Sequence, residues 1–161
     1  MYMCFKDKSK SQHYFHKLRK IWQDKDILIV EGEYTRSGVG NDLFANARSI
    51  QRIICPAEDA YDEVDEIEEA IRNEAQNKLI LLMLGPTAKV IVNDLQDLNN
   101  QMLDVGHIDT EYEWFKMGAK YPVPIGKNKH TAEAAYEYLG EENDPQYQKE
   151  IIMKINKKEK P

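Results

Sequence analysis

The sequence has few cysteines and no long apolar run. Its two cysteines, Cys4 and Cys55, are too few for a disulfide framework and do not form a Cys-x-x-Cys metal-binding pair. No apolar stretch approaches the ~20 residues that a membrane-spanning helix requires. The first residues also lack the apolar core of a secretory signal. These absences predict a reduced, cytoplasmic protein without a membrane span.

An excess of positive charge is also absent. The 161 residues include 22 Lys and Arg against 28 Asp and Glu, a net charge of −6. Proteins that bind the phosphate backbone of nucleic acids concentrate positive charge, so we expect no nucleic-acid partner. One basic segment, residues 6–20, could face an acidic surface, although Asp24 and Asp26 follow it closely. With 42% hydrophobic residues, the chain can bury the core of one domain of ordinary size.

Short apolar runs alternate with longer amphipathic segments. The runs at 27–30, 49–55, 79–84 and 102–105 predict four buried strands, and glycine or proline follows each of them closely. Helical spacing of apolar residues predicts helices at 60–77, 88–98 and 108–115, and one before the first strand. Such alternation is typical of a parallel sheet covered by helices. The predicted fold class is therefore α/β, a Rossmann-like three-layer sandwich with a mostly parallel sheet.

The pattern fades after residue 120. We therefore assign residues 1–125 to the Rossmann-like domain and residues 126–161 to a polar C-terminal extension. Residues 149–161 mix isoleucines with lysines, which predicts either a short helix at the domain edge or a frayed tail.

The loop after the first predicted strand, residues 31–42, is rich in glycine. In open parallel sheets, ligands bind beyond the carboxyl ends of the strands, where this loop lies. Arg36 is suited to pairing with a phosphate, and Asn41 or Asp42 to capping a following helix. The alternative is a solvent-exposed loop with a salt-bridged arginine. The candidate ligand-binding residues of this loop are Glu31, Gly32, Arg36, Gly40, Asn41 and Asp42.

A second loop, Gly85-Pro86-Thr87, ends the most apolar strand. Glycine allows a tight turn, proline suits the first helical turn, and Thr87 places a hydroxyl beside unpaired helix N–H groups. A phosphate or carboxylate would bind there. The same three residues also make an ordinary strand-to-helix turn, which remains the alternative.

A third loop gathers a histidine and three carboxylates. His107, Asp109, Glu111 and Glu113 follow the fourth predicted strand within seven residues. If a helix begins near Asp109, Glu113 lies one turn further on the same side. The group could hold a divalent cation or supply a general base. Alternatively, Asp109 caps the helix and the acids favour its dipole, which leaves His107 without a role.

Together these loops resemble the family of glucosyltransferases with the GT-D fold. The matching stretches are WQDKDILIVEGEYTRSGVGNDLF at 22–44, ILLMLGPTA at 80–88 and DVGHIDTEYEWFKMG at 104–118. With the strand at 50–56, the resemblance covers roughly residues 10–120. Members of that family transfer glucose from UDP-glucose to a glycan on a protein or polysaccharide, and they use a divalent metal, usually Mn²⁺ (or Mg²⁺).

The resemblance also implies roles for individual residues. Gly85, Pro86, Thr87 and the loop at 31–42 would line the pocket for the UDP-sugar donor. His107 would lie near the metal, and Glu113 would be the catalytic base that deprotonates the hydroxyl of the glycan or glycoprotein acceptor.

The family's Asp-x-Glu metal motif precedes its first matching helix and has no counterpart here, since Glu31-Gly32-Glu33 matches a different position. The chain is therefore expected to be a C-terminal portion that binds metal weakly or not at all alone. Self-association, or pairing with an N-terminal half, would follow from an unpaired sheet edge.

Two alternatives belong to other functional classes. A non-catalytic module derived from a glycosyltransferase would keep a nucleotide-shaped cleft or a surface for docking a partner. A dinucleotide-dependent enzyme fits less well, because Gly38-Val39-Gly40 is an incomplete glycine fingerprint and the second strand ends in Cys55-Pro56 without an acidic residue.

Overall fold

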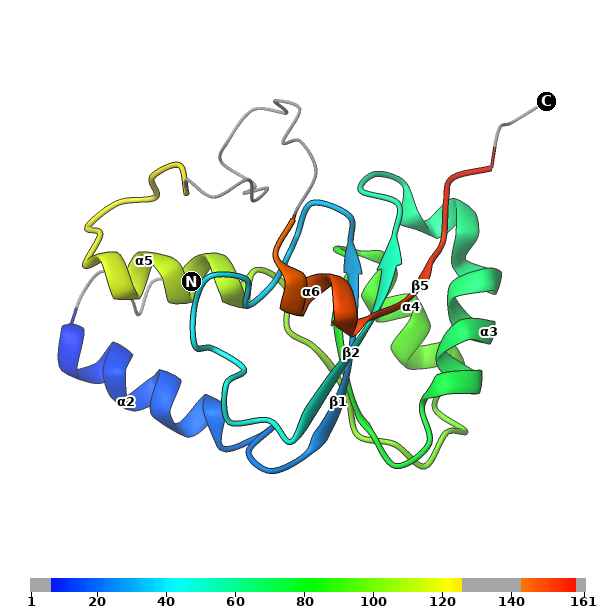
Figure 1. Cartoon of the computed structure of the whole chain (residues 1–161), viewed down its shortest axis with the longest axis horizontal. Helices are drawn as coiled ribbons and strands as arrows, with labels where there is room; N and C mark the ends of the chain where they lie inside the picture. Colours follow the sequence, from blue (N-terminus) through cyan, green and yellow to red (C-terminus); the bar gives the residue numbers. More distant parts are fainter. Residues whose placement is uncertain (1–6, 126–142, 159–161) are drawn as a thin grey trace.

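Five parallel strands form the centre of the protein, shown as a computed structural model that describes residues 7–125 and 143–158. Across the sheet the order is β4-β3-β1-β2-β5, and every neighbouring pair is parallel. Figure 1 shows this sheet edge-on, with helices on either side of it. The strands are β1 (Asp26–Gly32), β2 (Ser49–Cys55), β3 (Leu79–Met83), β4 (Met102–Asp104) and β5 (Ile151–Lys154). The first four coincide with the strands predicted from the sequence.

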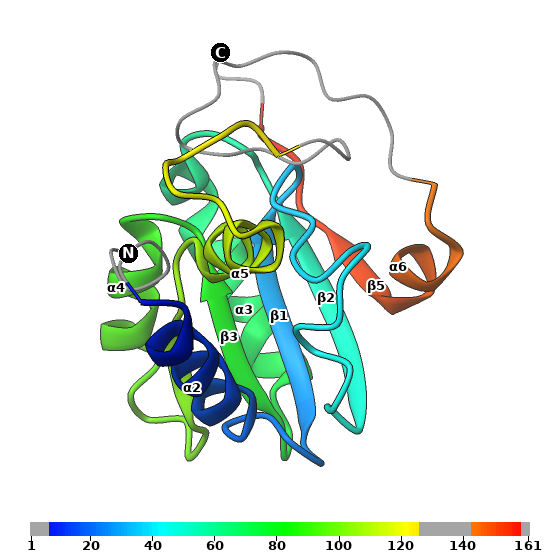
Figure 2. The same cartoon turned by 90° about the vertical axis from the view of Figure 1, so that its left-hand side faces the viewer.

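Helices cover both faces of this sheet, which confirms the predicted three-layer α/β fold. Alternate residues of β1 point to opposite faces, as strand geometry requires. Leu28 and Val30 pack with α3 (Val64–Glu74) and α4 (Thr87–Asp94). Ile27 and Ile29 pack on the other face, with α2 (Lys8–Arg19) and α5 (Ile108–Met117) (Figure 2). A short 3₁₀ helix, η1 (Ala60–Glu63), leads into α3.

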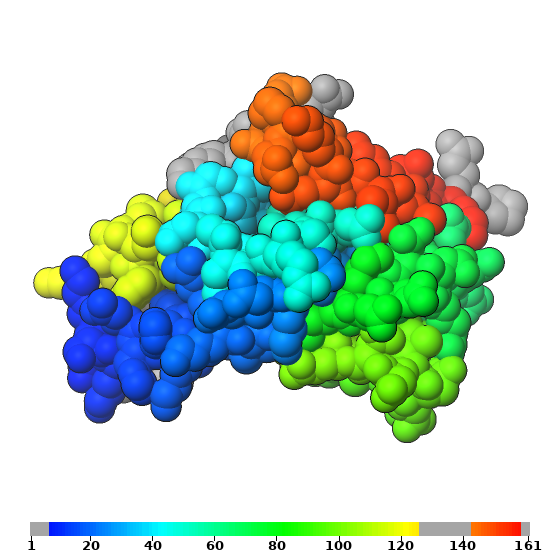
Figure 3. All heavy atoms as spheres, turned by 60° about the horizontal axis from the view of Figure 1, so that its bottom comes forward, coloured from blue at the N-terminus to red at the C-terminus, as the bar shows by residue number. Residues whose placement is uncertain are grey.

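The connection from β1 to β2 differs from the prediction. Residues 33–48 cross the sheet as successive turns with no helix, so Asn41 and Asp42 do not cap one. Instead, the Asn41 Oδ1 atom accepts a hydrogen bond from the Leu43 backbone N–H, 2.9 Å away. This asparagine stabilises a turn, a role that its short polar side chain performs as readily as helix capping. Figure 3 shows the connection in cyan, between α2 in blue and α6 in orange.

The C-terminal segment was predicted incorrectly. Residues Pro145–Glu150 form α6, and Ile151–Lys154 form β5, which pairs with β2 at the sheet edge. The expected short helix or frayed tail at 149–161 is therefore wrong for these residues, which complete the sheet. Residues 126–142 of the predicted extension lie outside the described residues.

Two further observations concern membranes and the Cys55 thiol. Within residues 7–125 and 143–158, no helix combines the length and the apolar character needed to cross a membrane. Cys55 is 1% exposed at the end of β2. Burial, followed by the neighbouring Glu31 carboxylate, raises the pKa of its thiol to about 12, as expected of a packed residue rather than a nucleophile.

Candidate functional site

The glycine-rich loop after β1 is anchored from beneath by Glu31. This side chain is fully buried, and its Oε2 atom accepts a hydrogen bond from the Ser37 backbone N–H at 2.8 Å. Its Oε1 atom lies 2.6 Å from Nη1 of Arg52. Glu31 was predicted to line a nucleotide pocket. In the structure its carboxylate lies inside the protein and holds the loop by the bond to Ser37.

Arg52 extends this anchor to the C-terminal segment. Its Nε atom donates to Oε2 of Glu150 at 2.8 Å, and its guanidinium lies 4.9 Å from the centroid of the Tyr147 ring. Burial alone would lower the pKa of Arg52, but the carboxylates of Glu31 and Glu150 raise it above its ordinary value. The guanidinium therefore stays charged between two buried carboxylates, and helix α6 is connected to the loop after β1.

The same loop contacts α5 through Gly38 and Asn41. The Gly38 backbone N–H donates to Oδ1 of Asp109 at 2.7 Å. The Asn41 Nδ2 atom donates to that same oxygen at 2.8 Å and to Oε1 of Glu113 at 2.7 Å. Asp109 and Glu113 thus lie one turn apart on the same side of the helix, as predicted, although the helix begins at Ile108 with His107 as its N-cap residue. One amide group orients both carboxylates.

Glu113 borders a pocket of about 570 Å³. Glu113 is 4% exposed, so it lies in the wall of this pocket rather than on the open surface. The pocket is lined by Gly40, Asn41, Asp42, Glu113, Lys116 and Met117. It therefore joins Glu113, predicted to be catalytic, with three of the loop residues predicted to contact a nucleotide.

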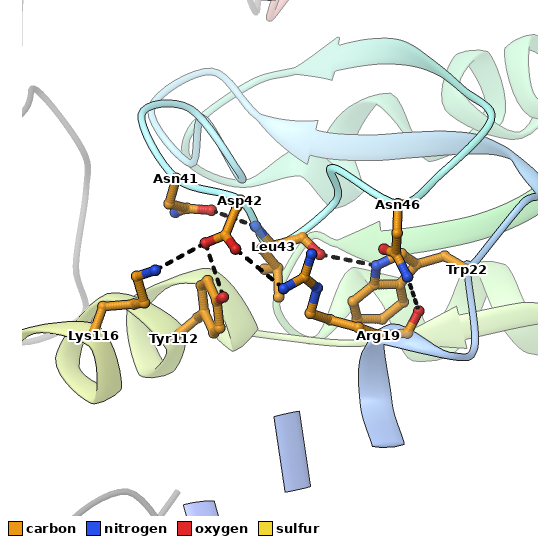
Figure 4. Close-up of polar contacts among 8 residues, drawn as sticks. All are labelled: Arg19, Trp22, Asn41, Asp42, Leu43, Asn46, Tyr112 and Lys116. Atoms are coloured by element: carbon orange, nitrogen blue, oxygen red, sulfur yellow. Dashed lines mark hydrogen bonds and ion pairs between the residues drawn. The ribbon is translucent and has the colours of Figure 1, made fainter. Parts of the chain in front are cut away.

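Asp42 forms the rim of this pocket and is held by three side chains (Figure 4). Its carboxylate accepts a hydrogen bond from the Tyr112 hydroxyl at 2.9 Å and pairs with Lys116 and Arg19 at 3.1 Å each. Partial burial acts to raise the pKa of Asp42, but hydrogen bonds from Lys116 and Tyr112 and the nearby positive charges lower it overall. Asp42 is therefore a charged connection between the loop, α5 and α2.

Other predicted site residues lie outside this pocket. Gly85, with φ +54°, and Pro86 are exposed at the carboxyl end of β3, and Thr87 starts α4 with 7% exposure. His107 is exposed at the start of α5. None of these four lines the pocket around Glu113. Across the described part of the chain, no group of three or more His, Cys, Asp or Glu side chains is arranged to hold a metal ion.

Two loop residues have positions that the sequence did not indicate. Arg36 is only 3% exposed, with φ +46°, and its guanidinium lies 5.6 Å from the centroid of the Tyr34 ring. This differs from the predicted arginine presented to a phosphate. Gly32 is buried at the end of β1, and a Cβ there would lie 3.5 Å from the Thr35 hydroxyl, an ordinary contact.

Gly38 makes the loop sensitive to substitution. It has φ +80°, and a Cβ at this position would lie 2.7 Å from Cδ2 of the buried Phe44 ring. We expect Gly38→Ala to lower the free energy of unfolding by about 2–4 kcal/mol, because backbone strain adds to overpacking. Urea denaturation measures the loss. Gly118→Ala is the matched control, since Gly118 has φ +66° with open space around its Cβ. Equal losses for the two variants would contradict the steric part of this argument.

Sequence reasoning missed the contribution of Arg52 and Glu150. The sequence did offer one sign of this ion pair, because an arginine within an apolar strand, such as Arg52, needs a carboxylate partner. Its partner is 98 residues away in the sequence, within the segment predicted to be an extension. Asp109 was considered as a helix cap, a metal ligand or a general base, whereas its carboxylate accepts hydrogen bonds from Gly38 and Asn41 of the loop.

The chain belongs to the family of glycosyltransferases with the GT-D fold, because the family model described as "Glycosyltransferase GT-D fold" matches residues 1–134. Among curated proteins, it is 52% identical over 155 residues to "Probable glycosyl transferase Gly" of Streptococcus gordonii. It is 51% identical over 158 residues to "Glycosyltransferase GlyD" of Streptococcus pneumoniae serotype 4 (strain ATCC BAA-334 / TIGR4). These alignments cover 96% of this chain but only 23% and 19% of the two relatives.

Solved structures give the same result for the fold. A structure described as a new glycosyltransferase (DUF1792) from Streptococcus sanguinis has 52% identity and a TM-score of 0.89, over 94% of this chain and 56% of that one. A second, described as a domain of unknown function 1792 with a distinct glycosyltransferase fold, has 51% identity and a TM-score of 0.88. That match covers 94% of this chain and 55% of the other. This chain thus spans just over half of the solved domains.

Proposed function

We propose that this chain supplies the acceptor-activating part of a glycosyltransferase site that transfers glucose from UDP-glucose to a glycan on a protein or polysaccharide. The observation that carries the proposal is the double hydrogen bond from Asn41 to Asp109 and Glu113, which orients a carboxylate in the wall of a pocket. The membership of the chain in the GT-D family supports the reaction class.

The proposed reaction is a displacement at the anomeric carbon. Glu113 takes the proton of the acceptor hydroxyl as its oxygen forms a bond to that carbon. The bond from the anomeric carbon to the diphosphate oxygen breaks, and UDP leaves with the bonding electron pair. Asn41 keeps the carboxylate in place before the substrate arrives, which removes the need to order it during the reaction.

A divalent metal such as Mn²⁺, when bound, would offset the charge on the leaving diphosphate. The described residues do not by themselves form a set of three metal-binding side chains, and His107 lies exposed at the start of α5. We therefore derive no step through a metal held by these residues, and a requirement for Mn²⁺ remains part of the proposal to be tested.

Calorimetric titration with UDP and UDP-glucose, with and without Mn²⁺, tests the donor half of the proposal. We expect UDP-glucose to bind, and we expect Thr87→Val to weaken this binding about tenfold because the variant removes one hydroxyl hydrogen bond to a charged group. Ser49→Ala is the matched control. The Ser49 hydroxyl donates to Asp26 at the amino ends of β1 and β2, whereas Thr87 follows the carboxyl end of β3. Absence of binding at millimolar UDP-glucose would contradict the donor site and favour a non-catalytic docking module.

A further inference from the structure

A second and larger depression lies between α2 and α5. Its volume is about 680 Å³. Its aromatic lining consists of Phe15 from α2 and Tyr112 and Phe115 from α5, and the Phe15 ring packs against the other two at centroid distances of 5.0 Å. We refer to this depression as the α2–α5 groove. Figure 2 shows the two helices next to one another on the same face of the sheet.

The side chains that line the groove include basic groups although the chain as a whole is acidic. Among the residues that the structure describes, no Asp or Glu lines it, and helix α2 (Lys8–Arg19) contains none. Arg19 and Lys116, which also line it, are paired with Asp42. His13, His16 and Lys20 add basic groups whose side chains belong to exposed residues. A chain of net charge −6 therefore carries a surface suited to carboxylates.

Carboxamide side chains distinguish the kind of anion that fits. Gln12 and Gln23 line the same groove, and both are exposed. A carboxamide presents a donor and an acceptor side by side, as a peptide group does, so these side chains can pair with an extended polypeptide backbone. Basic groups alone would attract any anion, whereas this combination favours an acidic peptide.

The groove adjoins the pocket that contains Glu113. Lys116 lines both, and Asp42, on the rim of the Glu113 pocket, bonds Arg19 and Tyr112 of the groove. Building on the proposed function, we propose that the α2–α5 groove binds an acidic peptide segment of the acceptor and leads the neighbouring acceptor hydroxyl to Glu113. The groove thereby contributes to acceptor choice.

Fluorescence anisotropy with a labelled peptide of alternating glutamate and serine tests this site directly. We expect saturable binding that weakens as salt rises, since screening reduces attraction between exposed charges. The double variant His16→Glu, Lys20→Glu should weaken binding at least about tenfold, because like charges then face the peptide. Lys89→Glu is the matched control, since Lys89 is an exposed residue of α4 on the opposite face of the sheet.

Three outcomes would overturn the inference. They are equal binding of a lysine–serine peptide, tighter binding of the acidic polysaccharide hyaluronate, or unchanged peptide binding by the double variant. Donor titration of the same variants keeps this test separate from the proposed function. If UDP-glucose binds and the peptide does not, the peptide site in the groove is refuted and the proposed function stands. If the peptide binds and UDP-glucose does not, the proposed transferase site is refuted and the groove is a peptide-docking surface.

Discussion

On the proposed function, Glu113→Gln is expected to lower glucose transfer by about 10²–10⁴-fold while leaving the affinity for UDP-glucose nearly unchanged. The amide has almost the same shape, and its oxygen can still accept the hydrogen bond from Asn41. It cannot take a proton from the acceptor hydroxyl, so only the chemical step suffers. UDP release in the presence of acceptor measures the rate, and calorimetry with UDP-glucose measures the affinity.

Glu111→Gln is the matched control for this prediction. Glu111 lies on the same helix and is partly buried, but it does not line the pocket around Glu113. We expect this variant to retain transfer within about threefold, since it leaves the base and its positioning amide in place. Loss of donor binding in Glu113→Gln, or an equal loss of transfer in both variants, would refute the assigned role of Glu113.

Arg52→Leu is expected to lower the free energy of unfolding by about 3–5 kcal/mol. The guanidinium lies between Glu31 and Glu150, which are 0% and 8% exposed. Its removal leaves two buried carboxylates without their shared counter-charge, and leucine supplies no hydrogen bond to replace those lost. Equilibrium urea denaturation, followed by circular dichroism, gives the difference from the unaltered chain.

Arg72→Leu provides the comparison on the surface. Arg72 pairs with Asp97 at 2.7 Å, but their side chains are 40% and 63% exposed. Exposed pairs contribute about 0–1 kcal/mol, so this variant should unfold within that margin of the original. If the two arginine variants lost equal stability, burial would not be the cause of the effect at Arg52.

Local patterns were sufficient to predict most of the sheet. The boundaries of β2 were predicted at Ser49 and Cys55, because isoleucines fill the strand and Pro56 ends it. Strand β5 was missed because it has only four residues, which are alternately partly buried and exposed, and because lysines surround it in the sequence. Such an edge strand is specified by its pairing with β2, which sequence patterning does not show.

The candidate site was predicted unevenly for a similar reason. Helical periodicity placed Asp109 and Glu113 on the same side of a helix, and the structure confirms this arrangement. No local pattern shows that Asn41, 72 residues from Glu113, donates to both carboxylates. The same local reasoning gave Asn41 or Asp42 a capping role, because it assumed a helix where the chain forms successive turns.

The position of α6 and β5 shows where a shortened version of this protein should not end. The family model stops matching at residue 134, yet Glu150 and β5 lie beyond that point. A chain cut at that boundary would expose the backbone N–H and C=O groups along β2, which are a template for pairing with another molecule. It would also remove one of the two carboxylates that hold Arg52. Aggregation of such a fragment would then reflect the choice of endpoint.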